Sequence, residues 1–95
     1  MDTINNEKII AEIIKENGFY IEDFDEAQLK IISIAVEKQI GMQYINKLVN
    51  PQIGAFFMKS AIDDILIENI NPIDYLYSNV TLKEYCVLRK KLFDR

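Results

Sequence analysis

The chain has 95 residues and a formal charge of −4, and 49% of its residues are hydrophobic. These values predict one globular domain spanning residues 1–95, and they exclude an intrinsically disordered chain. The lack of histidine removes the usual general base and most zinc sites, and the single cysteine cannot form an intramolecular disulfide.

The start of the chain gives no sign of targeting or membrane insertion. No apolar run approaches the roughly 20 residues of a membrane-spanning helix. The first residues include Asp2 and Glu7 and lack the basic start and apolar stretch of a signal peptide. We therefore expect a cytoplasmic protein.

The first predicted element is a helix over residues 4–17. Isoleucines recur at helical spacing along it, at positions 9, 10, 13 and 14. Gly18 then ends the helix, because glycine tolerates the positive φ of a helix C-terminus.

The most apolar run of the chain follows, at residues 29–36. Its β-branched residues would also suit a buried strand. Asp23 and Glu26, however, have the spacing of a capping box, and Gly41 supplies a stop. We therefore predict a helix over residues 24–39, with an apolar surface wide enough to be nearly surrounded by other elements.

Two Asn-Pro pairs punctuate the second half of the chain. A short helix over residues 42–49 should stop at Asn50, since proline disfavours α geometry in the residue before it. Pro51 can then open a long helix over residues 51–69, with Asn50 as its cap and Gly54 as an internal weak point. Asn71-Pro72 repeats the device and starts a second short helix over residues 73–77.

Thr81 and Glu84 have a second capping-box spacing and predict a last helix over residues 82–93. Its inward side should consist of Leu82, Tyr85, Leu88 and Leu92. The predicted fold is therefore all-α: about four longer helices alternating with two short ones. Apolar positions recur with apparent periods of 29 and 27 residues, which is in the range of helical repeats. A compact irregular bundle is the alternative.

The chain offers little for catalysis or metal binding. Cys86 has no histidine to activate it, and we expect it to be a small buried hydrophobic residue. Asp63, Asp64 and Glu68 are interpreted as a solvated helix face, with Lys59 paired to Asp63 one turn away. No glycine-rich phosphate loop is present. We expect no metal and no cofactor.

The sequence favours a non-enzymatic protein–protein interaction module. Tyrosine together with arginine is typical of protein-contact hot spots, although core packing is the alternative for these rings. The expected partner-binding residues are Tyr75, Tyr77, Arg89, Lys90 and Phe93. Residues 78–95 carry a net charge of +3 and the rest −7, so self-association into a homodimer is also considered.

An enzyme is the class of protein that the sequence supports least. Two further functions are considered, both of them non-enzymatic. One is a small phage- or mobile-element-type inhibitor that blocks a nucleic-acid-processing or defence enzyme with carboxylates in place of phosphates. Its acidic surface would consist of Glu22, Asp23, Asp25, Glu26, Asp63, Asp64 and Glu68, provided that they line one exposed stripe. The other is a DNA-contacting regulator that uses the basic last helix. Nucleic-acid binding is not the favoured reading, because a helix-turn-helix over residues 27–48 would carry only Lys47 on its recognition helix.

Overall fold

A computed structural model describes residues 3–94, with the side chains of residues 7–94, so Asp2 and Arg95 lie outside it. The elements are α1 (Thr3–Glu16), the 3₁₀ helix η1 (Ile21–Asp23), α2 (Glu26–Glu37), α3 (Met42–Leu48), α4 (Ala55–Leu66), the 3₁₀ helix η2 (Pro72–Tyr75) and α5 (Leu82–Phe93). The described residues contain no strand, which confirms the all-α prediction. None of these helices combines the length and apolarity that a membrane-spanning segment requires.

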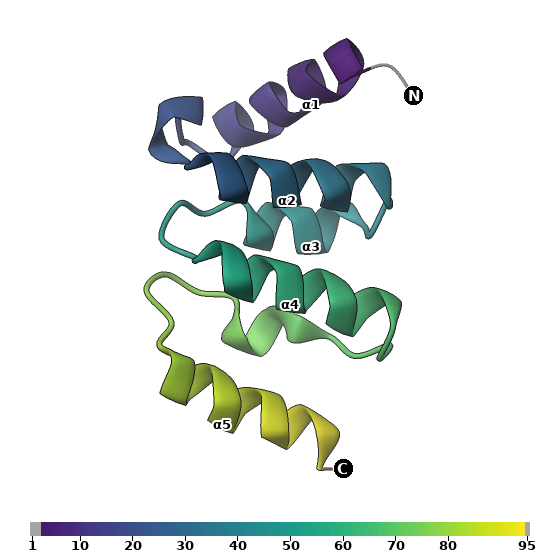
Figure 1. Cartoon of the computed structure of the whole chain (residues 1–95), viewed down its shortest axis with the longest axis vertical. Coiled ribbons are helices and arrows are strands. Elements are labelled where there is room, and N and C mark those ends of the chain that lie inside the picture. The colour runs from purple at the N-terminus through teal and green to yellow at the C-terminus, as the bar shows by residue number, and fades with distance from the viewer. Residues whose placement is uncertain (1–2, 95) are drawn as a thin grey trace.

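The helices form a stack along an axis of 41 Å, with α1 at one end and α5 at the other (Figure 1). α2 packs against α1, α3 and α4, α4 packs also against η2, and η2 packs against α5. The predicted order of long, long, short, long, short and long helices is confirmed, and η1 is an additional element. Each long helix therefore contacts the long helices that precede and follow it in the chain.

Three long helices of the stack start at similar spacing and after a buried apolar residue, although only α2 and α5 have a side-chain cap. The N-cap residues of α2, α4 and α5 are 29 and 27 positions apart, which matches the apparent period of the sequence. The residue before each N-cap is apolar and buried: Phe24, Ile53 and Val80. A buried residue at this position fixes the angle at which the chain enters a helix. The spacing of these starts agrees with the apparent period, and the helices form a compact all-α bundle.

The start of α2 differs from the prediction by two residues. Its N-cap is Asp25, whose carboxylate accepts a hydrogen bond from the Gln28 amide at 2.8 Å, while the Gln28 side chain accepts one from the Asp25 amide at 2.9 Å. Asp23 does not cap α2, because its carboxylate accepts a hydrogen bond from the Tyr20 amide at 2.9 Å and closes η1. Asp23 and Asp25 both have a suitable position for an N-cap of α2. Because η1 uses the carboxylate of Asp23, Asp25 is the one that caps α2.

The end of α2 also uses a different residue from the one predicted. Gln39, not Gly41, follows the C-cap of α2 and adopts the positive φ of a helix end, 53°. The amides of Gln39 and Ile40 then bond to the carbonyls of Val36 and Ala35, which is the Schellman arrangement. Gly41 instead precedes α3 as its N-cap. The expectation that α2 is nearly surrounded is wrong on one side, where Ile34 is exposed.

The predicted start of α4 at Pro51 is wrong. The helix begins at Ala55, and Gly54 is its N-cap rather than an internal weak point. Asn50 instead builds a turn: its side chain accepts a hydrogen bond from the Gln52 amide at 2.9 Å. The turn buries Ile53 completely, which a helix starting at Pro51 would place differently.

The second Asn-Pro pair starts a short helix, as predicted. The helix is of the 3₁₀ type and covers Pro72–Tyr75 rather than residues 73–77. Asn71 caps η2 by accepting a hydrogen bond from the Ile73 amide at 3.0 Å, and Pro72 lies in the first turn. Thr81 and Glu84 form the predicted capping box at the start of α5. These local signals therefore place the last two elements correctly.

Candidate functional site

Asp64 is fully buried between α4 and α5, so its assignment to an exposed acidic surface is wrong. Arg89 from α5 reaches it with two donors: Nη2 lies 2.8 Å from Oδ1, and Nε lies 3.1 Å from Oδ2. A buried carboxylate is costly unless it is paired and hydrogen-bonded, and the guanidinium supplies both. In turn, the hydrogen bond to Asp64 raises the pKa of Arg89. The pair joins α4 to α5 through two residues that are 25 positions apart in the sequence.

Tyr75 is also fully buried, so it cannot be the surface contact that the sequence suggested. Its hydroxyl donates a hydrogen bond to Asp64 Oδ2 at 2.6 Å. Burial, and then the hydrogen bond to the Asp64 carboxylate, raise the pKa of Tyr75 far above the ordinary value of 10.0. Tyr75 therefore belongs to the buried polar network that holds α4, η2 and α5 together.

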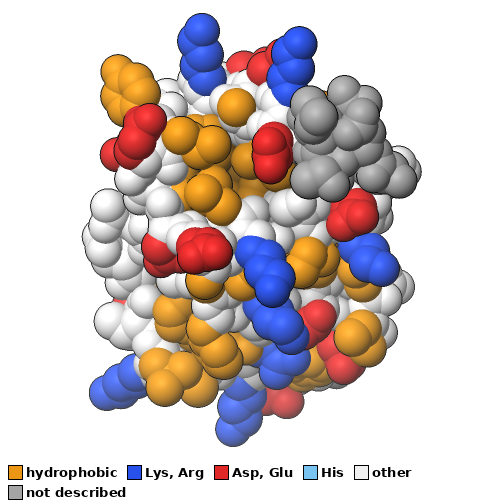
Figure 2. All heavy atoms as spheres, turned by 45° about the horizontal axis from the view of Figure 1, so that its top comes forward, with side chains coloured by type: hydrophobic (Ala, Val, Ile, Leu, Met, Phe, Trp, Pro, Cys, Tyr) orange, Lys and Arg blue, Asp and Glu red, His pale blue; other side chains and the backbone are white. Residues whose placement is uncertain are grey.

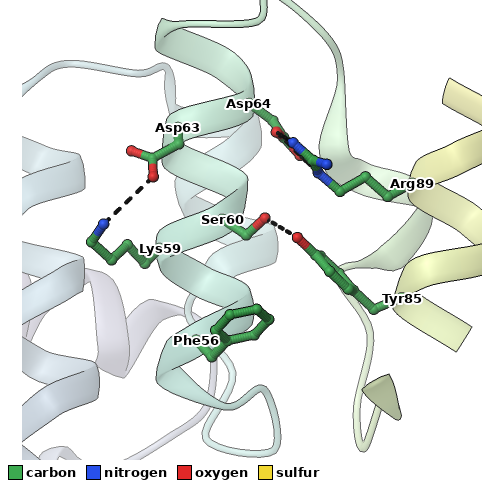
Figure 3. A pocket seen from close by; sticks show the side chains of 7 residues that line it. All are labelled: Phe56, Lys59, Ser60, Asp63, Asp64, Tyr85 and Arg89. Carbon is green, nitrogen blue, oxygen red and sulfur yellow. Dashed lines mark hydrogen bonds and ion pairs between the residues drawn. The ribbon is translucent and has the colours of Figure 1, made fainter. Parts of the chain in front are cut away.

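Tyr85 completes the seam between α4 and α5. Its hydroxyl hydrogen-bonds to Ser60 of α4, as Figure 3 shows, while its ring packs edge-on against Tyr75 with centroids 4.9 Å apart. The rings of Phe56 and Phe57 lie 5.5 and 5.3 Å from it. Tyr75 and Tyr85 therefore pack in the core, which was the alternative to a role in partner binding.

A pocket of about 200 Å³ opens onto this seam (Figure 3). Its lining consists of Phe56, Lys59, Ser60, Asp63, Asp64, Tyr85 and Arg89. The predicted Lys59–Asp63 ion pair is confirmed, with 3.5 Å between Nζ and Oδ2. Since the other polar groups of this pocket bond to one another, the pocket is a structural seam rather than a set of free reactive groups.

The remaining candidate residues lie on the outside of α5 and beside it. Tyr77 and Phe93 are exposed, and so is Lys90. The guanidinium of Arg89 lies 4.7 Å from the centre of the Phe93 ring. Arg89 therefore serves both as the partner of Asp64 and as a support for Phe93.

Three other side chains of α5 correct or extend the sequence analysis. Cys86 is exposed, not buried as predicted. Leu82 was predicted to face inward and is exposed instead, and Val87 is exposed as well. Val87 and Leu88 of α5, together with Tyr77, form the apolar part of a groove of about 280 Å³. Val87 was detectable as an apolar residue outside the predicted inward row, whereas Leu82 shares the helical spacing of that row.

The groove beside Tyr77 has one acidic edge. Glu84 lies there together with Lys83. Hydrogen bonds from Thr81, and a further one from Tyr77, lower the pKa of Glu84. Desolvation and then the hydrogen bond to Glu84 raise the pKa of Tyr77. Tyr77 and the helix cap of α5 therefore line the same groove.

The seven predicted acidic-surface residues do not line one stripe. Four of them lie in η1 and at the start of α2: Glu22, Asp23, Asp25 and Glu26. Asp63 is in α4 and Glu68 follows it, while Asp64 is buried. Lys30 lies beside Asp25 and Glu26 on one side and beside Lys59 and Asp63 on the other. Figure 2 shows basic side chains between separated acidic ones on this face.

Within residues 3–94, no three acidic or cysteine side chains come together in an arrangement that could hold a metal ion. Comparison of the chain with protein-family models, with curated protein sequences and with solved structures yields no match.

Proposed function

We propose that this chain is a non-enzymatic, cytoplasmic protein that works by binding another protein through its last helix. The contact surface, called the α5 surface below, consists of Tyr77, Leu82, Lys83, Val87, Lys90 and Phe93. One observation carries the proposal: α5 ends the described stack and leaves three large apolar side chains exposed, at positions 82, 87 and 93.

The position of α5 in the stack explains why these side chains lack cover. α2 is covered by α1, α3 and α4, and α4 is covered by α2 and η2. α5 packs on η2 and reaches α4 mainly through side chains, such as Arg89 and Tyr85. Within residues 3–94, no element lies on its other side. An amphipathic helix with a second apolar surface is a common way for one protein to present a contact to another.

The arrangement of side chains on α5 favours a protein partner. Successive helix positions differ by about 100°, which places Lys83 and Lys90 between Val87 on one side and Leu82 with Phe93 on the other. The aromatic rings of Tyr77 and Phe93 are of the kind enriched in protein contacts, and the two lysines suit the polar rim of such a contact. A DNA-contacting surface would concentrate cations, and Arg89 is already paired with Asp64.

The acidic-inhibitor hypothesis has weaker support than the protein-binding one. It needs carboxylates along one exposed stripe, but Asp64 is buried, and Lys30 and Lys59 interrupt the remainder. A mimic of the DNA backbone would lose attraction wherever a cation replaces an expected negative charge. We therefore retain the α5 surface as the proposed site.

The test uses a matched pair of substitutions. Val87→Glu places a charge on the α5 surface, and Met42→Glu does the same at an equally exposed residue elsewhere; the two side chains are 50% and 49% exposed. Wild type and both variants, each checked for folding by circular dichroism, are used for affinity capture from host extract with quantitative mass spectrometry. We expect one protein to be retained by wild type and Met42→Glu and lost with Val87→Glu.

The same experiment can overturn the proposal. Retention that is equal for all three proteins would show that the α5 surface is not the contact. Retention that disappears after nuclease treatment, or falls steeply with salt, would assign the surface to nucleic acid instead.

A further inference from the structure

The two ends of the stack carry opposite charges. Residues 7–26, which form most of α1, η1 and the start of α2, contain seven acidic and two basic side chains. Residues 82–93, which form α5, contain four basic and one acidic side chain. α1 and α5 lie at opposite ends of the 41 Å axis (Figure 1). The molecule is therefore polarised along its length.

The acidic end also exposes apolar side chains. Ile9 of α1 and Tyr20 with Ile21 around η1 are exposed, close in sequence to Glu22 and Asp23. Figure 2, which turns the α1 end toward the viewer, shows apolar patches beside acidic side chains in its upper half. We call this region, with the acidic residues of η1 and of the start of α2, the α1 end. The α1 end is acidic whereas α5 is basic, and both regions expose apolar side chains that could be buried together.

From these two observations we infer that a second copy of this chain is a partner of the α5 surface, and that the copies join head to tail. The α5 surface of one copy packs on the α1 end of the next, so that the stack of helices continues from one molecule into the other. This inference rests on the proposed function of the α5 surface and names its partner.

The two contacting surfaces differ, which makes the contact heterologous rather than two-fold symmetric. A contact of this kind leaves one free end on each copy. It therefore grows into a chain of molecules unless the rotation between copies closes a ring. A symmetric homodimer would instead bring two basic α5 surfaces together, and their like charges would repel each other.

Two variants that each block one end test the inference. Val87→Glu adds a negative charge to the α5 surface and blocks its contact with the acidic α1 end. Ile9→Lys adds a positive charge to the α1 end and blocks its contact with the basic α5 surface. Met42→Glu serves as the control, and the molar mass is measured by light scattering and sedimentation over a range of protein and salt concentrations.

We expect the wild type and Met42→Glu to increase in mass with protein concentration and to dissociate as salt is added. Each blocked variant alone should be a monomer. Their equimolar mixture should associate, because one intact α5 surface meets one intact α1 end. Circular dichroism of each variant establishes that it is folded.

Three results would overturn the inference: a wild type that stays monomeric, a mixture of blocked variants that stays monomeric, or assembly that survives both substitutions. A monomeric wild type leaves the proposed function standing if Val87→Glu still abolishes capture of a different protein. The failure of the inference and the failure of the proposed function are therefore distinguishable.

Discussion

Arg89 and Asp64 form a two-pronged ion pair whose carboxylate is fully buried and whose guanidinium side chain is 34% exposed. The pair fixes α5 against α4, while Tyr75 donates a third hydrogen bond to the same carboxylate. The anchor of the last helix is therefore polar, although the helix lies over an aromatic cluster.

Replacement of Arg89 by methionine should destabilise the chain strongly. It leaves the buried Asp64 carboxylate without a counter-charge, and breaking a buried pair in this way costs up to several kcal/mol. We expect a loss of about 3 kcal/mol in the free energy of unfolding, near the lower end of the range because Arg89 is partly exposed. Urea denaturation measures this loss.

The double variant Asp64→Asn/Arg89→Met is the control for that loss. It removes both charges and keeps an amide oxygen that can accept the hydrogen bond from Tyr75, so most of the lost stability should return. A double variant as unstable as Arg89→Met would mean that the lost packing of the arginine side chain, rather than the unpaired charge, causes the effect.

Tyr75 should make the chain sensitive to alkaline pH. Burial and the hydrogen bond to Asp64 raise its pKa in the folded state, whereas in the unfolded chain the pKa returns to about 10. The stabilising contribution is therefore complete below about pH 10 and falls as the pH rises above it, because only the unfolded chain then releases the proton. The expected slope is about 1.4 kcal/mol per pH unit.

Tyr75→Phe tests this dependence, with Tyr20→Phe as the exposed control. Tyr75→Phe should lose about 1 kcal/mol at neutral pH, because one hydrogen bond to Asp64 disappears. Its free energy of unfolding should then vary less between pH 9 and pH 11 than that of Tyr20→Phe. An unchanged alkaline slope in Tyr75→Phe would assign the sensitivity to other groups.

Gln28→Glu should destabilise the start of α2 and the turn before α4 together. The Gln28 amide nitrogen donates hydrogen bonds to the carbonyl oxygens of Pro51 and Ile53, at 3.1 and 2.8 Å. A carboxylate loses both donations and places negative charge against two carbonyls. We expect a loss of about 3 kcal/mol in the free energy of unfolding.

Glu84→Gln is the control, since Glu84 occupies the equivalent capping-box position of α5 and is exposed. Glutamine can still accept the hydrogen bond from Thr81, so its cost should stay below about 0.5 kcal/mol. Similar losses for the two substitutions would contradict a special role for the buried amide.

Gly54→Ser should stabilise the chain by about 0.5–1 kcal/mol. Gly54 is an N-cap with a φ of −63°, and serine can supply the side-chain cap that glycine lacks. A Cβ there would meet only the Phe57 ring, at an ordinary contact distance of 3.4 Å. Gly41→Ser is the contrasting variant and should destabilise the chain, because the φ of 109° at Gly41 strains any residue with a side chain. Thermal unfolding should move in opposite directions for the two substitutions.

Short-range signals predicted the helices well. The Thr81–Glu84 capping box, Gly18 and the Asn71-Pro72 pair all act through neighbours within a few positions, and each occurs as predicted. The start of α2 was off by two residues because Asp23 and Asp25 both had suitable spacing. The choice between them depends on η1, which the sequence pattern did not indicate.

Long-range partners limited the prediction of the site. Whether Asp64 is exposed or buried depends on Arg89, which is 25 residues away in the sequence. One signal was present: Asp64 follows Ala61 by three positions, which places it on the inward side of α4. Burial of Tyr75 depends on the same carboxylate, so both assignments failed together.

Because the elements of the stack pack mainly on adjacent ones, the molecule should unfold in parts. A helix that contacts only adjacent layers can be lost without disturbing distant ones, and local stability then decreases toward the ends. α2, with packed layers on several sides, should hold its backbone amide protons longest in heavy water. α5 depends on η2, Arg89 and Tyr85, so its amides should exchange early, through a partly opened form in which the rest of the stack persists.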